Sequence, residues 1–207
     1  MSLAVPVRAV SHILHRIAVT LRLVWYNFTC FVFFRPLPFS TTIYGRIRLL
    51  HRPCRLKIGR NCRIGDDTYF ATSLTSTIEW GDDVTVNMGC VFVAIDSIRI
   101  GKNTAIAEYV SFRDQAHEMA EGQGVRGQGY KSGPIEVGEN VWIGRGAYIG
   151  AGTQIGNDCV VGANSVVHGT FPPGVLIAGA PARVRKVLIP SPEADAALAA
   201  TREKSAS

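Results

Sequence analysis

Hydrophobic residues recur at every sixth position between Ile135 and His168. The recurring positions are Val137, Ile143, Ile149, Ile155, Val161 and Val167, and glycine follows each of the first five. This spacing fits neither a helix face nor the two-residue alternation of a flat sheet. The residue three after each of the first five is Asn140, Gly146, Gly152, Asp158 or Asn164, types that tolerate a left-handed backbone at a turn. Each six-residue unit therefore predicts a short strand and a corner, and stacked units predict a β-solenoid.

The same phase extends towards the N-terminus in groups of three. The five triplets are Ile58, Ile64 and Phe70; Trp80, Val86 and Phe92; Ile100, Ile106 and Phe112; Val137, Ile143 and Ile149; and Ile155, Val161 and Val167. Extra residues occur only between triplets, four before Trp80, two before Ile100 and nineteen before Val137. The pattern predicts an all-β fold, a parallel β-helix of about five triangular coils over residues 56–188.

Two further motifs carry a family resemblance. VWIG at residues 141–144 and GAPARVRK at residues 179–186, together with the six-residue repeats, resemble the hexapeptide-repeat acyltransferases. Within that family the pattern is most similar to sugar and polysaccharide O-acetyltransferases, over about residues 56–188. The resemblance implies a left-handed β-helix, a homotrimer, active sites between neighbouring subunits and acetyl-CoA as co-substrate. It implies no metal, and we expect no nucleic-acid partner.

Charge is distributed unevenly along the chain. Residues 1–65 contain eleven Arg and Lys residues and no Asp or Glu, whereas the remainder carries eleven basic and sixteen acidic residues, a net charge of −5. This asymmetry indicates an anionic partner for the N-terminal part. The five cysteines (30, 54, 62, 90 and 159) lack metal-site or disulfide spacing, which is typical of core residues in a reducing cytoplasm.

Residues 7–34 have the pattern of an amphipathic helix. The apolar stripe is Val10, Ile13, Leu14, Ile17, Leu21, Val24 and Phe28. Three interpretations stand: a cap on the open end of the solenoid, a helix lying on the inner face of the membrane, and a membrane span, which Arg22 and Asn27 disfavour. Residues up to 55 then form a basic connector that contains at most a first irregular strand. The tail at 189–207 is small and polar and predicts a loose helix or a flexible segment.

One long insertion, residues 113–134, interrupts the repeats. It contains His117, which matches the position of the catalytic histidine of the resembling family, 25 residues before Trp142. The resemblance implies that His117 is the general base, and Asp114 and Glu118 are the candidates to orient its ring. An ordinary loop histidine with solvated carboxylates is the alternative.

The resemblance also implies roles outside the insertion. Asn87, thirty residues before His117, matches the asparagine that binds the acceptor. The backbone N–H of Arg145 matches the oxyanion donor after WIG, and Trp142, Gly144 and Ala163 match positions that line the CoA site. Arg183 and Lys186 match the basic residues that hold the CoA phosphates, a role that suits their charge. Corner geometry, subunit packing and a solvated basic strand are the corresponding structural alternatives.

The predicted function is acetyl-CoA-dependent O-acetylation of a sugar hydroxyl, in surface polysaccharide or glycolipid biosynthesis. The acceptor is then a small-molecule or lipid-linked sugar. N-acetylation of an amino sugar or xenobiotic is the first alternative, and a non-catalytic trimeric scaffold is the second. A γ-class carbonic anhydrase is excluded, because it needs three zinc-binding histidines and only His117 lies near a suitable corner.

Overall fold

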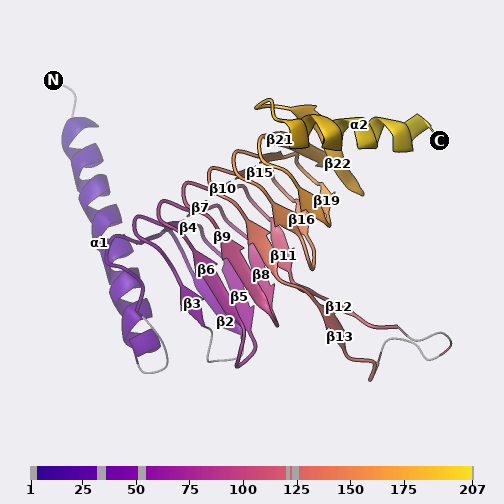
Figure 1. Ribbon diagram of the computed structural model, residues 1–207. Helices are drawn as coiled ribbons and strands as arrows, with labels where there is room; N and C mark the ends of the chain where they lie inside the picture. Colours follow the sequence, from indigo (N-terminus) through magenta and orange to yellow (C-terminus); the bar gives the residue numbers. More distant parts are fainter. Residues whose placement is uncertain (1–3, 32–35, 51–54, 120–121, 123–125, 207) are drawn as a thin grey trace.

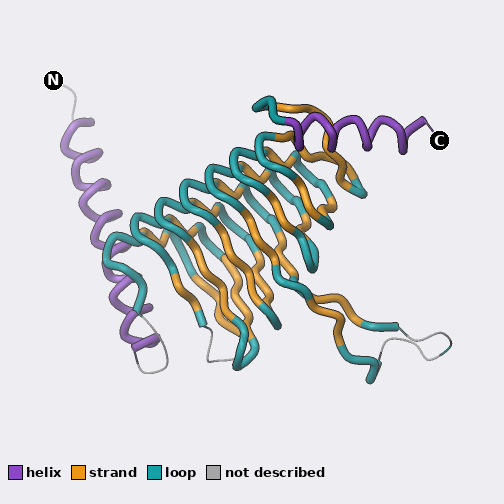
Figure 2. Tube along the Cα trace, in the orientation of Figure 1, coloured by secondary structure: helices purple, strands orange, loops and turns teal. Residues whose placement is uncertain are grey.

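Three parallel sheets run along the protein and form the walls of a β-solenoid, with one helix at each end (Figure 1). The computed structural model describes residues 4–31, 36–50, 55–119, 122 and 126–206. Figure 2 shows that the strands are joined by short corner loops and lie between the two helices.

Each sheet takes one strand from every turn of the chain. The first sheet contains β1 (Thr42–Ile43), β4 (Arg63–Ile64), β7 (Thr85–Val86), β10 (Ala105–Ile106), β15 (Trp142–Ile143), β18 (Val160–Val161), β21 (Val175–Gly179) and the antiparallel β22 (Ala182–Val187). The second contains β2 (Ile47–Leu50), β5 (Thr68–Thr72), β8 (Val91–Ala94), β11 (Ser111–Arg113), β16 (Tyr148–Ile149) and β19 (Val166–Val167). The third contains β3 (Leu56–Lys57), β6 (Thr77–Trp80), β9 (Ser97–Ile100), β14 (Ile135–Val137), β17 (Gln154–Ile155) and β20 (Thr170–Phe171).

The register confirms the six-residue repeat. Ile64, Val86, Ile106, Ile143 and Val161 are paired along the first sheet, and their side chains fill the interior. On the second sheet Phe70, Phe92 and Phe112 stack with ring centroids 5.2 and 4.8 Å apart. The corner residues Asn140, Asp158 and Asn164 have positive φ, as their types predicted.

The solenoid has six turns, so the prediction of about five was wrong. The strands missed are β1 and β2, which the sequence assigned to a basic connector, and β20, which follows the last recognised triplet. Ile43 and Leu49 keep the six-residue spacing and pair with Ile64 and Phe70. The step of nine residues from Leu49 to Ile58 is an insertion at the same corner as the others, so the spacing was present in the sequence but was not followed beyond Leu56. After β20, β21 begins a seventh turn and β22 folds back along it.

Helix α1 (Ala4–Phe31) covers the open end of the first turn, as the capping interpretation required (Figure 1). Leu23 and Tyr26 are buried against it, and the Asn27 side chain holds the backbone of Leu37 through hydrogen bonds of 2.7 and 3.0 Å. Within the described part of the chain, no helix is both long and apolar enough to cross a bilayer. His51 and Cys54 lie outside the described residues.

The C-terminal tail is an ordered helix rather than a flexible segment. Helix α2 (Pro192–Ala206) lies beside β22, and Ala194 is fully buried. The Ser191 hydroxyl accepts a hydrogen bond from the Ala194 N–H at 3.1 Å, which makes it the N-cap of the helix. Glu193 and Asp195 in the first turn favour the same start. The small, polar composition of the tail did not by itself indicate this helix start.

Candidate active site

The long insertion forms a hairpin that leaves the corner between the second and third sheets. Its strands are β12 (Gln115–His117) and β13 (Tyr130–Ser132), and Figure 1 shows them projecting away from the solenoid wall. The other insertions lie at the same corner, between β5 and β6 and between β8 and β9, as the sequence predicted. Residues 120–121 and 123–125 of the insertion lie outside the described residues.

Asp114 anchors the root of this hairpin. Its side chain is fully buried, and its carboxylate accepts hydrogen bonds from the Ile95 N–H (2.8 and 3.1 Å) and the Asp96 N–H (2.7 Å). Burial raises the pKa of the Asp114 carboxyl, while these backbone donors act in the opposite direction. The carboxylate is therefore engaged with the neighbouring turn, and no contact of it with His117 occurs in the described structure.

His117 lies exposed near the end of β12. Its cross-strand partner is Tyr130, and the two ring centroids are 4.5 Å apart. Glu118, the second candidate to orient the ring, donates its backbone N–H to the Gly129 carbonyl at 3.2 Å. Within the described chain the ring of His117 is therefore held by an aromatic neighbour, and neither predicted carboxylate bonds to it. The sequence alone could not identify Tyr130 as the neighbour of His117, because the pairing of β12 with β13 was not known.

A groove of about 910 Å³ runs over the outer face of the second sheet towards this hairpin. Its floor is largely apolar and includes Tyr69, Val91 and Val93, and Gln115 and Tyr130 line its hairpin side. The side-chain oxygen of Gln115 is buried and has no hydrogen-bond partner among the described residues. No repeat or motif in the sequence marks this glutamine, and its free acceptor favours a ligand with a donor group.

The opposite edge of the second sheet carries a second polar cluster. The Asn87 side-chain amide donates to Glu108 Oε1 at 2.9 Å, and the Arg145 guanidinium lies 5.5 Å from the centroid of the Tyr109 ring. Tyr109 has φ +59°, a conformation that favours Gly or Asn and is strained for an aromatic residue. Because Tyr109 also lines the groove, this corner belongs to the candidate site.

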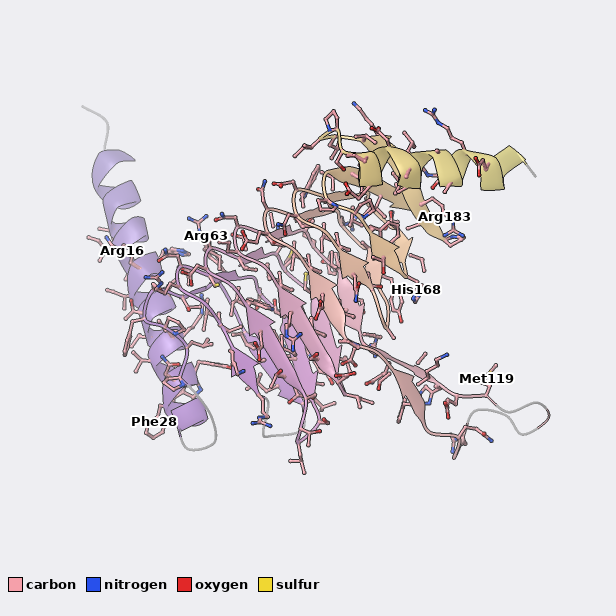
Figure 3. All side chains as sticks on the ribbon, in the orientation of Figure 1. Arg16, Phe28, Arg63, Met119, His168 and Arg183 are labelled. Carbon is pink, nitrogen blue, oxygen red and sulfur yellow. The ribbon has the colours of Figure 1, made fainter. Side chains whose placement is uncertain are left out.

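The residues expected to bind CoA lie along the first sheet and its corner with the second. Trp142, Val160, Leu176 and Lys186 are in register on adjacent strands, and Trp142 and Lys186 are exposed. Three strand spacings separate Trp142 from Lys186, about 14 Å. Arg183 extends from the same edge strand, β22, and Figure 3 shows it at the outer end of that strand.

The corner after Trp142 requires close backbone approach. A Cβ on Gly144 would lie 2.7 Å from the Ala163 nitrogen and 2.8 Å from the Val161 oxygen, so glycine is needed there. The N–H groups of Gly144 and Gly146 donate to the carbonyls of Val161 and Glu108. Between them, the Arg145 N–H has no acceptor within the described structure, so it is available to a ligand oxygen.

Comparison with known proteins identifies this architecture. The family model for the bacterial transferase hexapeptide (six repeats) matches residues 134–169, and that for the hexapeptide repeat of succinyl-transferase matches residues 55–94. The chain belongs to the hexapeptide-repeat acyltransferases.

Members of this family with sugar-related names are similar to the chain. It is 29% identical over 161 residues to a putative lipopolysaccharide biosynthesis O-acetyl transferase of Escherichia coli K12, covering 71% of this chain and 82% of the relative. It is 35% identical over 127 residues to the galactoside O-acetyltransferase of that strain, covering 61% of each chain. A Vibrio cholerae hexapeptide-repeat acetyltransferase, solved with acetyl coenzyme A, has 26% identity and a TM-score of 0.53, covering 73% of this chain and 72% of that chain.

In a single copy of this hexapeptide-repeat acyltransferase, the expected site residues form two groups. Trp142, Gly144, Arg145 and Ala163 share the first sheet or its corner with the second, together with Asn87, and Arg183 and Lys186 lie on β22 of the first sheet. Asp114, His117 and Glu118 lie on the hairpin at the other edge of the second sheet. One chain therefore leaves the proposed base apart from the proposed CoA-binding residues.

Proposed function

We propose that this hexapeptide-repeat acyltransferase transfers an acetyl group from acetyl-CoA to a sugar hydroxyl during surface polysaccharide or glycolipid biosynthesis. The observation that carries the proposal is the position of His117, on a hairpin at the end of a groove that holds an unsatisfied polar acceptor. The names of the relatives, a putative lipopolysaccharide O-acetyl transferase and a galactoside O-acetyltransferase, support a sugar acceptor.

The proposed cofactor site is the outer face of the first sheet. Trp142 lines the pantetheine arm, Gly144 and Ala163 allow close backbone approach, and Arg183 and Lys186 pair with the CoA phosphates. Arg offers a planar fork of donors and Lys a point charge, and both suit phosphate oxygens.

The proposed chemistry is direct transfer. His117 takes the hydroxyl proton as the acceptor oxygen attacks the thioester carbon, and the free N–H of Arg145 stabilises the oxyanion. Collapse of the tetrahedral intermediate breaks the carbon–sulfur bond, and the imidazolium returns its proton to the leaving thiolate. The products are the acetyl ester and CoA. Asn87 and Gln115 hold the acceptor, while Asp114 and Glu118 fix the hairpin through their backbone contacts.

The proposed assembly is a homotrimer of left-handed solenoids. It would place the hairpin of one copy beside the first sheet of its neighbour and so join the two groups of site residues. The proposed location is the cytoplasm, in contact with the inner face of the membrane, and the buried thiols of Cys62, Cys90 and Cys159 suit that reducing compartment.

Thiol release from acetyl-CoA tests this function. The wild type and His117→Ala are compared across sugars, nucleotide sugars and lipid-linked glycans. We expect acceptor-dependent release by the wild type and a loss of about 10²–10⁴-fold in kcat for His117→Ala, with CoA binding retained. His15→Ala on α1 is the matched control, because it removes the same side chain far from the hairpin, and it should retain full turnover.

Calorimetric titration with CoA separates the remaining outcomes. Failure of both the wild type and His117→Ala to bind CoA would refute the enzyme and favour a scaffold. Undiminished turnover by His117→Ala would refute the role of His117 as general base, whereas the proposed transferase function would stand.

A further inference from the structure

Helix α1 has two apolar faces, and only one of them packs on the protein. Leu23 and Tyr26 are buried against the solenoid. A second set of apolar side chains is exposed, each between 49% and 69%. This exposed stripe consists of Val10, Ile13, Leu14, Ile17, Leu21, Val24, Trp25 and Phe28. Single exposed apolar residues are normal on a protein surface, but eight contiguous ones form a patch. The stripe therefore indicates an interaction site.

The stripe lies on the side of α1 opposite the packed face. At 100° per residue, its side chains span about 120° of the helix surface, centred away from Leu23 and Asn27. Figure 3 shows Phe28 on the outer side of the helix. The rings of Trp25 and Phe28 are 6.3 Å apart at one end of the stripe, and Phe39, eight residues after the last residue of the helix, is 85% exposed. Aromatic residues at the edge of an apolar face are typical of helices that lie in a membrane interface.

The surroundings of the stripe are cationic. Residues 1–65 contain no Asp or Glu. Lys57 and Arg60 pair with Glu79 and Asp82 of the second turn, and Arg46 and Arg48 with Asp67. In the described part of the chain the other cations of this end, Arg16, Arg22, Arg55 and Arg63, form no ion pair, and all four are exposed. An apolar stripe at this end would therefore meet a negatively charged surface most favourably.

We propose that the exposed stripe of α1 docks the protein in the plane of an anionic lipid bilayer. The apolar side chains enter the boundary between headgroups and acyl chains, and the four arginines that form no ion pair attract anionic headgroups. A second copy of the chain is the competing occupant. Pairing two such ends would bring two acid-free, strongly basic segments together, and this repulsion favours lipid.

Docking at this end also determines how far the proposed active site lies from the bilayer surface. The hairpin with His117 leaves β11, in the fourth turn, and projects sideways from the solenoid. Three strand spacings separate the first turn from the fourth, so the hairpin lies about 14 Å further from the bilayer than the first turn. If the proposed function holds, this height suits a sugar carried on a lipid, whose glycan extends from the membrane surface.

Vesicle flotation tests the docking independently of catalysis. The full chain is mixed with vesicles of phosphatidylglycerol and phosphatidylcholine in equal parts, or of phosphatidylcholine alone, at about 0.1 and about 0.5 M salt. We expect flotation with the anionic vesicles, weakened by high salt. Leu14→Glu combined with Leu21→Glu should reduce partitioning about tenfold or more, since it removes two apolar anchors and adds two charges of the wrong sign.

The matched control adds the same charges elsewhere. Ala199→Glu combined with Ala200→Glu places two carboxylates on exposed positions of α2, at the other end of the solenoid, and should float like the wild type. Failure of the wild type to float with anionic vesicles at low salt would overturn the proposal. So would stripe-dependent self-association without flotation, which would assign the stripe to a second copy. Thiol release with a soluble acceptor should be unchanged in the Leu14 and Leu21 variant, so a failure of docking is distinguishable from a failure of the proposed function.

Discussion

The backbone conformation at the corners explains why Tyr109 was not predicted as a site residue. Asp67, Tyr109 and Asn164 all adopt positive φ at the corner between the first and second sheets. Asp and Asn adopt this conformation readily, so they need no functional explanation. Tyr109 does not, and its ring lies between Arg145 and the groove. The sequence contains this signal, an aromatic residue at a position where the other turns have small residues. It can be recognised only once the strand register is known.

The buried thiol of Cys90 leads to a prediction about the pH dependence of stability. Burial raises the pKa of the Cys90 thiol from its ordinary value of 9.0 to about 11. Between these values the unfolded chain releases a proton that the native chain keeps, so the native state binds more protons and stability falls as pH rises. The free energy of unfolding should fall by about 2 kcal/mol more in the wild type than in Cys90→Ser between pH 8 and pH 11.

Urea unfolding at the two pH values measures this difference. Cys90→Ser removes the titrating group and leaves the backbone corner intact, so any fixed cost of the substitution cancels between the two pH values. Parallel pH dependence in both proteins would mean that the native thiol ionises as readily as the unfolded one.

At the scale of elements, the six-residue period predicted the central turns and their register, because every interior position there is aliphatic or aromatic. It failed at both ends. At the start, Ile43 and Leu49 keep the spacing but lie in a stretch that its basic composition led us to predict as a connector. At the end, the step from Val167 to Phe171 is only four residues, which breaks the period. The hairpin pairing of His117 with Tyr130 was also beyond reach, because no periodicity links β12 to β13 across the insertion.

The third sheet carries a ladder of alternating charges on its outer face. Lys57, Glu79, Arg99 and Glu136 are in register on β3, β6, β9 and β14, with Gln154 next on β17. Lys57 pairs with Glu79, and Arg99 pairs with Glu136 at 2.7 Å. All four are partly exposed, so each pair contributes only about 0.2–1 kcal/mol.

Reversing one charge in this ladder should lower the free energy of unfolding by more than the loss of a single ion pair would. Glu136→Lys places two cations side by side, and we expect a loss of about 1 kcal/mol in the free energy of unfolding, reduced at high salt. Gln154→Lys is the matched control, because it introduces the same charge next to Glu136 and continues the alternation; it should be neutral or slightly stabilising. Equal losses for the two variants in denaturant titrations would show that the alternation has no energetic role.

At the scale of the whole molecule, the separation of the two groups of site residues is the central feature. The proposed CoA-binding residues lie on the first sheet and its corner with the second, whereas the hairpin leaves the other edge of the second sheet. The proposed trimer resolves this separation by closed symmetry, since each copy then offers its hairpin to one neighbour and its first sheet to the other.

This arrangement predicts recovery of activity between two inactive variants. His117→Ala lacks the base, and Arg183→Glu combined with Lys186→Glu repels the CoA phosphates. In trimers refolded from equal amounts of the two chains, an intact hairpin meets an intact first sheet at about one quarter of the interfaces, so about one quarter of wild-type thiol release should return. Mixing the two variants after folding is the control and should recover nothing. If both groups acted within one chain, the refolded mixture would stay inactive, because every chain carries one defect.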